Sequence, residues 1–209
     1  MAYFPFFMDI AGQPGLIIGG GIVALRKVEK LLPYGPSLTV VSPNFCPELA
    51  EMGNISRICR EFSPQDVENR TFVIAASDDR AVNRQAAELC RVRGIPVNAV
   101  DDREACTFLF PALVRRGELS VGISTGGASP TAAIWLKERI GELLPENFGE
   151  LLDWLDSLRD RVRREVPEER DRKRVFQALF ARCMASGAPC GEEELRALLA
   201  DAGKEREHG

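Results

Sequence analysis

The chain has 209 residues, of which 45% are hydrophobic and 28% are charged, and its formal net charge is −4. This composition is that of a globular protein with one domain and an appendage, or with two small domains, and it excludes disorder along the whole chain. The acidic balance argues against nucleic-acid binding, and the apolar runs are shorter than a membrane span. The apolar start over 1–10 lacks a basic region before it, so we expect a packed edge there and not a signal peptide.

Six cysteines and one histidine limit the chemistry that the chain can perform. No two cysteines have the C-x-x-C spacing, so buried thiols in a reducing cytoplasm are favoured over disulfides or a zinc site, and we predict no metal site. His208 stands in a charged stretch at the end of the sequence. A mechanism that needs an imidazole base inside a pocket therefore has no good candidate.

Strand and helix patterns alternate over the first 100 residues. The short apolar runs predict strands at 16–18, 38–41, 55–62, 72–76 and 95–100. Helical spacing predicts helices over 22–32 and 81–93, and Gly94 follows the second of them. Short apolar strands that alternate with helices are typical of crossover units in a parallel sheet with both faces covered. We therefore expect an α/β fold with a Rossmann-like sheet at the N-terminus.

The pattern changes after Asp101. Two apolar runs, 108–115 and 119–124, flank Arg116-Gly117-Glu118 and predict an antiparallel hairpin. Ser129-Pro130 has the residue types of a helix start, and we expect that helix to reach residue 144. Beyond it only helices are expected, over about 147–165, 168–184 and 192–202. The C-terminal part should therefore be helical.

A glycine-rich junction links the first strand to the first helix. Gly19, Gly21 and Ala24 fit the pattern G-x-G-x-x-A. In this pattern the first glycine permits a tight turn, the second lets a pyrophosphate approach the backbone, and the third small residue lets helix and strand pack closely. The helix also points free N–H groups at the phosphates. The junction therefore predicts a dinucleotide site rather than a purely structural turn.

The end of the second predicted strand bears on which dinucleotide is bound. It reads Val41-Ser42-Pro43-Asn44, with neither the acid that usually holds the ribose hydroxyls nor an arginine for a 2′-phosphate. Ser42 and Asn44 can still hydrogen-bond a ribose. We expect NAD in preference to NADP.

Polar groups also follow the fifth predicted strand. Asp101 and Asp102 come directly after it, where ligands of open α/β sheets bind, and as neighbours they should point apart. Either they serve the site or they cap a turn. A second glycine junction, Ser124-Thr125-Gly126-Gly127-Ala128-Ser129-Pro130, is either an ordinary helix cap or a place for a carboxylate or phosphate.

Four motifs together resemble one family. They are 19–27, Ala75-Ala76-Ser77-Asp78-Asp79, Asn98-Ala99-Val100-Asp101 and the second glycine junction. In this order they are similar to the precorrin-2 dehydrogenase family of the siroheme synthase N-terminal type, well over about residues 1–145 and more loosely beyond. The resemblance implies homodimers that oxidise precorrin-2 to sirohydrochlorin with NAD, and in some members insert iron to give siroheme. It implies a Rossmann NAD-binding domain over 1–112, a central dimerisation region over 113–146 and a C-terminal helical domain over 147–209.

The resemblance also assigns site residues. Asp101 matches the family's essential aspartate and, with no core histidine available, is our candidate catalytic base. The candidate cofactor-binding residues are Gly19, Gly21, Ile22, Val23, Pro43, Asn44, Ser77 and Asp78. Because precorrin-2 carries many carboxylates, the candidate substrate-binding residues are Thr125, Gly126, Gly127, Arg103 and Arg115. Nothing similar to the methyltransferase half of the fused enzymes follows residue 209, so we expect the stand-alone form, located in the cytoplasm.

Other classes of function account for part of this sequence. A Rossmann module that senses a nucleotide without catalysis explains the first glycine junction, but it does not require the second. A short-chain alcohol dehydrogenase needs Tyr-x-x-x-Lys, and the residues four places after Tyr3 and Tyr34 are Phe7 and Leu38, so this class is excluded. A chelatase with a vestigial NAD site stays open.

Overall fold

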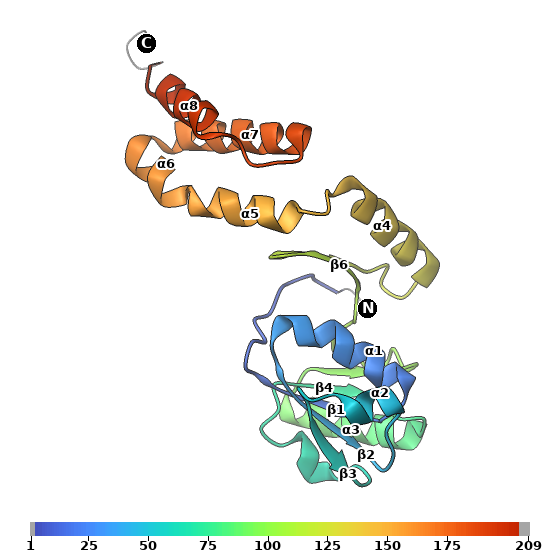
Figure 1. Ribbon diagram of the computed structural model, residues 1–209. Helices are drawn as coiled ribbons and strands as arrows, with labels where there is room; N and C mark the ends of the chain where they lie inside the picture. Colours follow the sequence, from blue (N-terminus) through green and yellow to red (C-terminus); the bar gives the residue numbers. More distant parts are fainter. Residues whose placement is uncertain (1–2, 205–209) are drawn as a thin grey trace. The chain divides into compact units, whose positions relative to one another are not determined.

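The computed structural model describes residues 3–204, which form two compact units (Figure 1). One unit holds the residues up to Phe110 together with Gly126–Ala128, and the other holds Pro111–Thr125 and the residues from Ser129 onward. His208 lies outside the described residues. Within 3–204 no helix has the length and apolar character needed to cross a membrane. The bounds of the three domains expected from the family remain predictions.

The first unit is built on a parallel sheet of five strands in the order β3-β2-β1-β4-β5. The strands are β1 (Pro14–Ile18), β2 (Ser37–Ser42), β3 (Ser56–Cys59), β4 (Phe72–Ala75) and β5 (Val97–Ala99). The chain runs outward from β1 to β3 and then returns to place β4 on the other side of β1. The strand order therefore reverses between β1 and β4, which is the switch point at which Rossmann folds bind dinucleotides.

Helices cover both faces of this sheet (Figure 1). The helices α1 (Ile22–Leu31) and α2 (Pro47–Glu51) pack on the face that carries Ile17, Val40 and Ile74. The helix α3 (Arg80–Arg93) packs on the opposite face, and short 3-10 turns occupy Leu32–Tyr34 and Pro64–Val67. Successive strand residues point to opposite faces and both faces are buried, so the strands read as continuous apolar runs.

Local sequence signals explain where α3 begins and ends. The Asp79 carboxylate accepts a hydrogen bond from the N–H of Ala81 at 2.8 Å and so caps the first turn. Gly94 ends the helix in the left-handed conformation, with φ of 69°. These caps set the bounds 80–93, close to the 81–93 expected from the sequence, and they place the first turn of α3 directly after β4.

The outer edge of the sheet at β5 is covered by the chain that follows it. The Thr107 N–H donates to the carbonyl oxygen of Val97 at 2.8 Å, and the Thr107 hydroxyl accepts from the N–H of Val97 at 2.8 Å. The returning segment thus takes the place of a sixth strand and satisfies backbone groups that an open edge would expose. It also fixes the loop that joins β5 to this segment.

The second unit holds a hairpin followed by helices. Strands β6 (Ala112–Arg116) and β7 (Leu119–Ile123) pair antiparallel across a two-residue turn, with Gly117 at a φ of 56°. The helix α4 (Pro130–Leu143) packs on this hairpin, and Ser129 caps it through the N–H of Ala132 at 3.1 Å. The remaining helices are α5 (Phe148–Ser157), α6 (Arg159–Glu165), α7 (Glu169–Ser186) and α8 (Glu192–Lys204).

The C-terminal helices have their own core. Seven buried residues form it: Leu158, Val162, Val166, Val175, Leu179, Leu195 and Leu199. Arg161 joins α6 to α8 through two hydrogen bonds of 3.0 Å to Glu192. The expectation of one helix over 147–165 was wrong, because the chain forms two helices that meet at Leu158, a buried residue of this core.

The six cysteines are all free in the structure. Cys90, Cys106 and Cys183 are buried, Cys46 and Cys190 are partly buried, and Cys59 is exposed, which the expectation of buried thiols did not include. Among the described residues no group of three or more His, Cys, Asp or Glu side chains is arranged to hold a metal ion.

Candidate active site

The first glycine junction requires glycine for two different steric reasons. Gly19 has a φ of 115°, and a Cβ there would overlap the carbonyl oxygen of Ala76 and lie 2.9 Å from the N–H nitrogen of Ser77. A Cβ on Gly20 would overlap the carbonyl oxygen of Asn44. The junction is thus held between the chain that follows β4 and the loop that follows β2.

Gly21 is different, because a Cβ there would have no atom within 4 Å. Gly21 is the N-cap of α1, it provides no side-chain cap, and no acidic residue occupies the first turn. The first N–H groups of the helix therefore face open space with the positive end of the helix dipole. Ile22 and Val23 follow, and these residues are 49% and 41% exposed. This geometry fits a pyrophosphate, with apolar side chains beside it.

The loop after β2 lies next to this junction. The N–H of Cys46 donates to the carbonyl oxygen of Gly20 at 2.8 Å, and the Cys59 thiol donates to the carbonyl oxygen of Pro43 at 3.3 Å. Pro43 and Asn44 are exposed, and Ser42 is buried. The predicted adenosine contacts Pro43 and Asn44 are therefore presented at the same edge as the glycine junction.

An arginine that sequence reasoning missed follows β3, the neighbour of β2. Arg60 forms two hydrogen bonds with the Asp66 carboxylate, at 2.8 and 2.6 Å. The Arg60 guanidinium lowers the pKa of Asp66. Burial raises this pKa, and the hydrogen bond from the N–H of Ser63 lowers it further. The Arg60 guanidinium is thus held by the Asp66 carboxylate. The pattern Arg-x₅-Asp across a loop gives no sequence signal of this pairing.

At the end of β4 the structure places Ser77 and Asp78 beside the glycine junction. The Asn83 side chain holds this turn, since its amide N–H donates to the carbonyl oxygen of Ser77 at 2.7 Å and its oxygen accepts from the N–H of Ser77 at 3.0 Å. Asn83 is 4% exposed. Sequence reasoning missed it, although an asparagine one turn into the helix after a polar junction is a usable signal. Asp78 is exposed.

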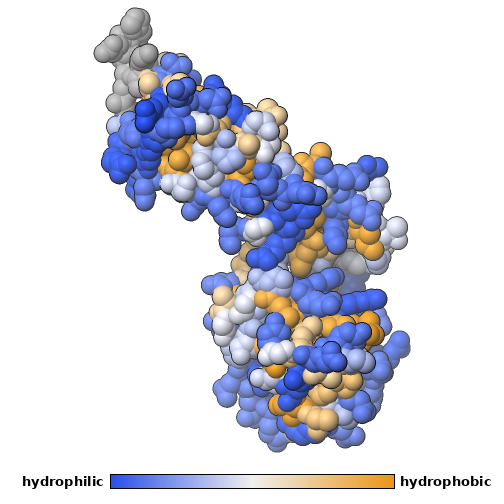
Figure 2. Space-filling model, viewed as in Figure 1, coloured by the Kyte–Doolittle hydropathy of each residue, from blue (hydrophilic) through white to orange (hydrophobic). Residues whose placement is uncertain are grey.

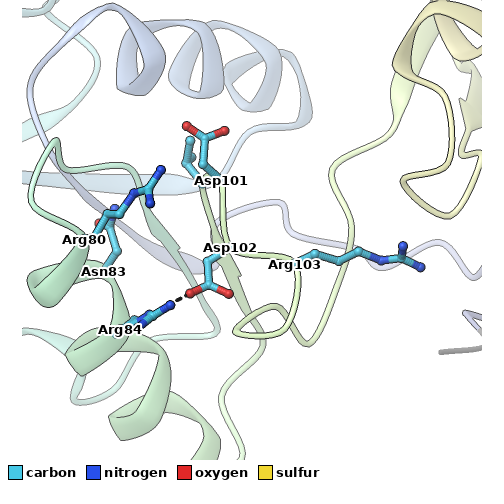
Figure 3. Close-up of a pocket in the computed structure, with 7 residues that line it drawn as sticks. Arg80, Asn83, Arg84, Asp101, Asp102 and Arg103 are labelled. Carbon is cyan, nitrogen blue, oxygen red and sulfur yellow. Dashed lines mark hydrogen bonds and ion pairs between the residues drawn. The ribbon is translucent and has the colours of Figure 1, made fainter.

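A pocket of about 140 Å³ opens beyond β4 and β5, and Figure 3 shows the side chains that line it. They are Arg80, Asn83, Arg84, Val100, Asp101, Asp102 and Arg103. Asp101 is exposed and has a φ of 59°, a left-handed conformation that aspartate adopts more readily than most residues. Its carboxylate points away from that of Asp102, as expected from their adjacency (Figure 3).

The two aspartates of the pocket have different partners. The Asp102 carboxylate accepts from Arg84 Nε at 2.9 Å and from the N–H of Ala105 at 3.2 Å, and both interactions lower its pKa. Asp101 forms no ion pair with any basic group in the described part of the chain. Asp102 is thus occupied in holding the loop, and Asp101 presents an open carboxylate to the pocket.

Two arginines of the pocket have no carboxylate partner among residues 3–204. They are Arg80, in the first turn of α3, and Arg103, in the loop after Asp102. Arg103 lies against the second glycine junction, because a Cβ on Gly127 would be 3.3 Å from its Cδ. The structure therefore brings together Arg103, Gly126 and Gly127, three of the predicted substrate-binding residues.

The other two predicted substrate-binding residues belong to the second unit. Thr125 uses its hydroxyl locally, since it donates to the carbonyl oxygen of Ser129 at 3.0 Å and accepts from the N–H of Ser129 at 3.1 Å. Arg115 lies in β6. Their role toward a substrate remains a prediction.

Lys27, on α1, is a titratable group near the pocket that sequence reasoning assigned no role. Its Nζ lies 4.1 Å from the ring centroid of Phe110, a cation–π contact. Burial, and then the charge of Lys30, lower the pKa of Lys27 to about 8, against the opposing effects of Cys106 and Asp101. The sequence signal is the Arg26-Lys27 pair in the helix that follows the glycine junction.

The strand order, the switch point and the glycine junction define the first unit as a Rossmann-type dinucleotide-binding fold. Comparison with known families agrees with this class. Residues 6–112 match the family NAD_binding_7, which is described as NAD(P)-binding, and residues 116–143 match the family described as the central part of a sirohaem biosynthesis protein. The chain belongs to this NAD(P)-binding family and carries the central sirohaem-biosynthesis segment, which confirms the resemblance seen in its motifs.

Curated relatives carry the name siroheme synthase. One from Thioalkalivibrio sulfidiphilus (strain HL-EbGR7) is 41% identical over 183 residues, which are 86% of this chain and 37% of the relative. One from Methylococcus capsulatus is 41% identical over 214 residues, covering 99% of this chain and 45% of the relative. The chain thus spans less than half the length of these relatives. The solved structure of SirC, a precorrin-2 dehydrogenase, matches with a TM-score of 0.73 at 24% identity and covers 97% of this chain and 100% of SirC. This match confirms the predicted fold class.

Proposed function

We propose that the protein oxidises precorrin-2 to sirohydrochlorin with NAD as the electron acceptor. The reaction is balanced as precorrin-2 + NAD⁺ → sirohydrochlorin + NADH + H⁺, so one hydride and one proton leave the substrate. The observation that carries the proposal is the open Asp101 carboxylate in a pocket at the same sheet edge as the dinucleotide junction. The names of the relatives, siroheme synthase and precorrin-2 dehydrogenase, support the choice of substrate.

In this proposal the residues of the first unit divide into three tasks. The backbone from Gly19 to Val23 binds the dinucleotide, with Pro43, Asn44, Ser77 and Asp78 beside it. When bound, the nicotinamide supplies the hydride acceptor. Asp101 accepts the proton that leaves the macrocycle, a task that suits an open carboxylate in reach of the pocket.

The third task is to bind the substrate carboxylates. Arg80 and Arg103 are exposed and pair with no carboxylate of the described chain. Guanidinium groups bind carboxylates in pairs of parallel hydrogen bonds. Arg80 and Arg103 both line the pocket that holds Asp101, and the Arg103 side chain extends away from Asp101 (Figure 3). Arg103 and the backbone at Gly127 form one such place in the first unit. The substrate-binding roles of Thr125 and Arg115, which belong to the second unit, remain predictions from the sequence.

The proposal includes NAD in preference to NADP. A 2′-phosphate needs a cation near the end of β2, where Ser42, Pro43 and Asn44 supply none. The arginine after the neighbouring strand, Arg60, is held by two hydrogen bonds to Asp66. Titration of the protein with NADH and with NADPH, followed by fluorescence, tests this preference.

The proposal also includes a homodimer formed through the second unit. Four large apolar residues of α4 are exposed: Ile134, Trp135, Leu136 and Leu143, by 39–74%. Figure 2 shows hydrophobic residues at the surface in the part of the view where α4 lies. Large apolar side chains left exposed on one helix are typical of an interface between proteins. A second copy of the chain is the partner that the family resemblance implies.

Iron insertion into sirohydrochlorin is a second activity for the same site. The Asp101 carboxylate supports it, since a group that accepts a proton from the macrocycle can also accept pyrrole protons as Fe²⁺ enters. Fe²⁺ is here a substrate. The cytoplasmic location belongs to the same proposal.

One coupled assay tests these functions. Purified protein is incubated with precorrin-2 and NAD, NADH formation is followed by absorbance, and Fe²⁺ or Co²⁺ is then added. Formation of NADH with sirohydrochlorin supports the dehydrogenase. NAD binding without turnover favours the sensory module, and metal insertion without NADH formation favours the chelatase with a vestigial NAD site.

A further inference from the structure

One buried thiol near the pocket has no part in the proposed reaction. Cys106 is 8% exposed and lies in the segment that returns along the outer edge of β5. Its Sγ is 3.2 Å from both the nitrogen and the carbonyl oxygen of Ala99, and 3.3 Å from the carbonyl oxygen of Asp102. The Asn98 amide nitrogen lies 3.5 Å from the same sulfur. Four polar atoms thus converge on one thiol.

These contacts use the thiol both as donor and as acceptor. Its single proton is shared between the carbonyl oxygens of Ala99 and Asp102, and its sulfur accepts from the Ala99 N–H and the Asn98 amide. Burial raises the pKa of Cys106, whereas the N–H of Ala99 and the charge of Lys27 lower it. The thiol therefore keeps its proton at neutral pH and remains a donor.

The thiol of Cys106 connects the two ends of the turn that carries Asp101. Ala99 and Asp102 stand on either side of Val100 and Asp101, so the sulfur joins the two ends of the segment that carries the candidate base. The direct backbone bond across this segment, from the N–H of Asp102 to the carbonyl oxygen of Ala99, is long at 3.5 Å. Asp101 has a positive φ of 59°. Such a conformation persists when the surrounding structure determines it.

We propose that Cys106 is a positioning residue for Asp101. Its thiol clamps the turn between Ala99 and Asp102 and so holds the Asp101 carboxylate at the pocket. This inference rests on the proposed function, because it assigns Cys106 a purpose in the same reaction. Asn98 supports the clamp from β5, since its amide also donates to the carbonyl oxygen of Phe108 at 3.1 Å.

The test compares three variants of the full-length protein. Cys106→Ala removes the thiol, and Cys106→Ser keeps a group that can donate and accept. Cys90→Ala is the matched control, because Cys90 is 0% exposed, belongs to the same hydrophobic core and has no side-chain hydrogen bond to a described residue. Thermal unfolding, NAD affinity, and kcat and KM for precorrin-2 are measured for each. The backbone chemical shifts and coupling constant of Asp101, which report its φ, are measured by NMR without substrate.

We expect both alanine variants to lose stability, because each leaves a small cavity in the same core. Only Cys106→Ala should lower kcat, by about 10- to 100-fold, since a misplacement of about 1 Å has an effect of this order. NAD affinity should be unchanged, the φ of Asp101 should change, and Cys106→Ser should recover part of kcat. These results would support the clamp.

Equal kcat in Cys106→Ala and Cys90→Ala would overturn the inference, and so would an unchanged φ of Asp101 in Cys106→Ala. If Cys106→Ala does not fold, Cys106→Ser is the deciding variant. Its kcat and the coupling constant of Asp101 must then both stay close to the wild-type values, and a loss of either overturns the inference. A wild-type protein that never forms NADH overturns the proposed function instead. The NMR measurement then still decides whether the thiol holds the turn.

Discussion

Arg84 Nε donates to the Asp102 carboxylate at 2.9 Å, across 18 positions of sequence, and this bond separates the roles of two adjacent aspartates. Asp102 is tied to α3 and to the N–H of Ala105, so its carboxylate fixes the loop. Asp101, one residue earlier, stays open to the pocket (Figure 3). A base must be able to gain a proton without breaking the fold, and Asp101 meets that condition better than Asp102.

The first prediction concerns Asp101. Asp101→Asn should lower kcat for precorrin-2 dehydrogenation by about 10²–10⁴-fold, because an amide cannot accept the proton. Asparagine also tolerates a positive φ, so the turn should remain folded. NAD affinity should stay near the wild-type value. The control is Glu104→Gln, which makes the same chemical change on an exposed side chain three residues further on. Comparable kcat values in the two variants would show that Asp101 is not the base.

The second prediction concerns the open space at Gly21. Gly21→Asp should weaken NAD binding by about 10²-fold or more, because repulsion between like charges at a binding site amounts to several kcal/mol. The protein should stay folded, since no atom lies within 4 Å of the added Cβ. Gly53→Asp is the matched control, since a Cβ on Gly53 is equally uncrowded. Gly53 precedes β3 and so lies toward the amino ends of the strands, whereas the glycine junction lies at their carboxyl ends. Calorimetric titration with NAD measures both affinities.

The third prediction concerns Gly19 and separates folding from binding. Gly19→Ala should destabilise the first unit by roughly 1–3 kcal/mol or more, because a positive φ and an overlap with Ala76 act together. Gly53→Ala should have little effect. Urea unfolding followed by circular dichroism measures both changes. Full wild-type stability in Gly19→Ala would mean that the junction relaxes around an added methyl group.

The fourth prediction concerns the apolar surface of α4. Trp135→Glu should shift the protein toward monomers, because a charge would be buried at the proposed interface between two copies. Val92→Glu is the control, since Val92 is 79% exposed on α3 of the first unit. Light scattering at micromolar concentration gives the mass of each. A wild-type protein that is already a monomer under these conditions contradicts the proposed dimer.

The fifth prediction follows from the lowered pKa of Lys27. With a pKa of about 8 in the fold against 10.5 in the unfolded chain, Lys27 destabilises the fold below pH 8, where both states are charged. This penalty should fall by up to about 1.4 kcal/mol per pH unit between pH 8 and 10.5. Lys27→Met should therefore be more stable than the wild type at pH 7, with a smaller difference at pH 10. Lys137→Met, on an exposed position of α4, is the control in urea unfolding.

Much of the first unit was predictable because local signals and tertiary packing agree there. The strand at β1, the glycines after it and the amphipathic spacing of α1 each indicate the same element. The caps Asp79 and Gly94 likewise bound α3. The helix α2 was missed because its five residues are too few to display a helical period. The break between α5 and α6 was missed because Leu158 continues the apolar pattern and is no helix breaker.

The candidate site was predictable where backbone geometry defines it and not where side chains from distant positions meet. The glycine junction and Asp101 stand at strand ends, which a periodicity argument can locate. The pairing of Arg84 with Asp102, and that of Arg60 with Asp66, depends on how loops approach one another. The contacts of Cys106 depend on a segment returning along β5, which a spacing of five residues from Asp101 does not reveal.

The close approach between Gly20 and Asn44 has a consequence for engineering the proposed cofactor preference. The space for a side chain on Gly20 is filled by the carbonyl oxygen of Asn44, and the N–H of Cys46 bonds back to Gly20 at 2.8 Å. The loop proposed to meet the adenosine and the turn proposed to meet the pyrophosphate are therefore held together by direct backbone contacts. A transplanted loop after β2 must reproduce the backbone path of residues 44–46, or it will distort the phosphate-binding turn along with the ribose contacts. Substituting side chains on the existing loop is for this reason a safer route to an NADP-dependent variant than exchanging the loop.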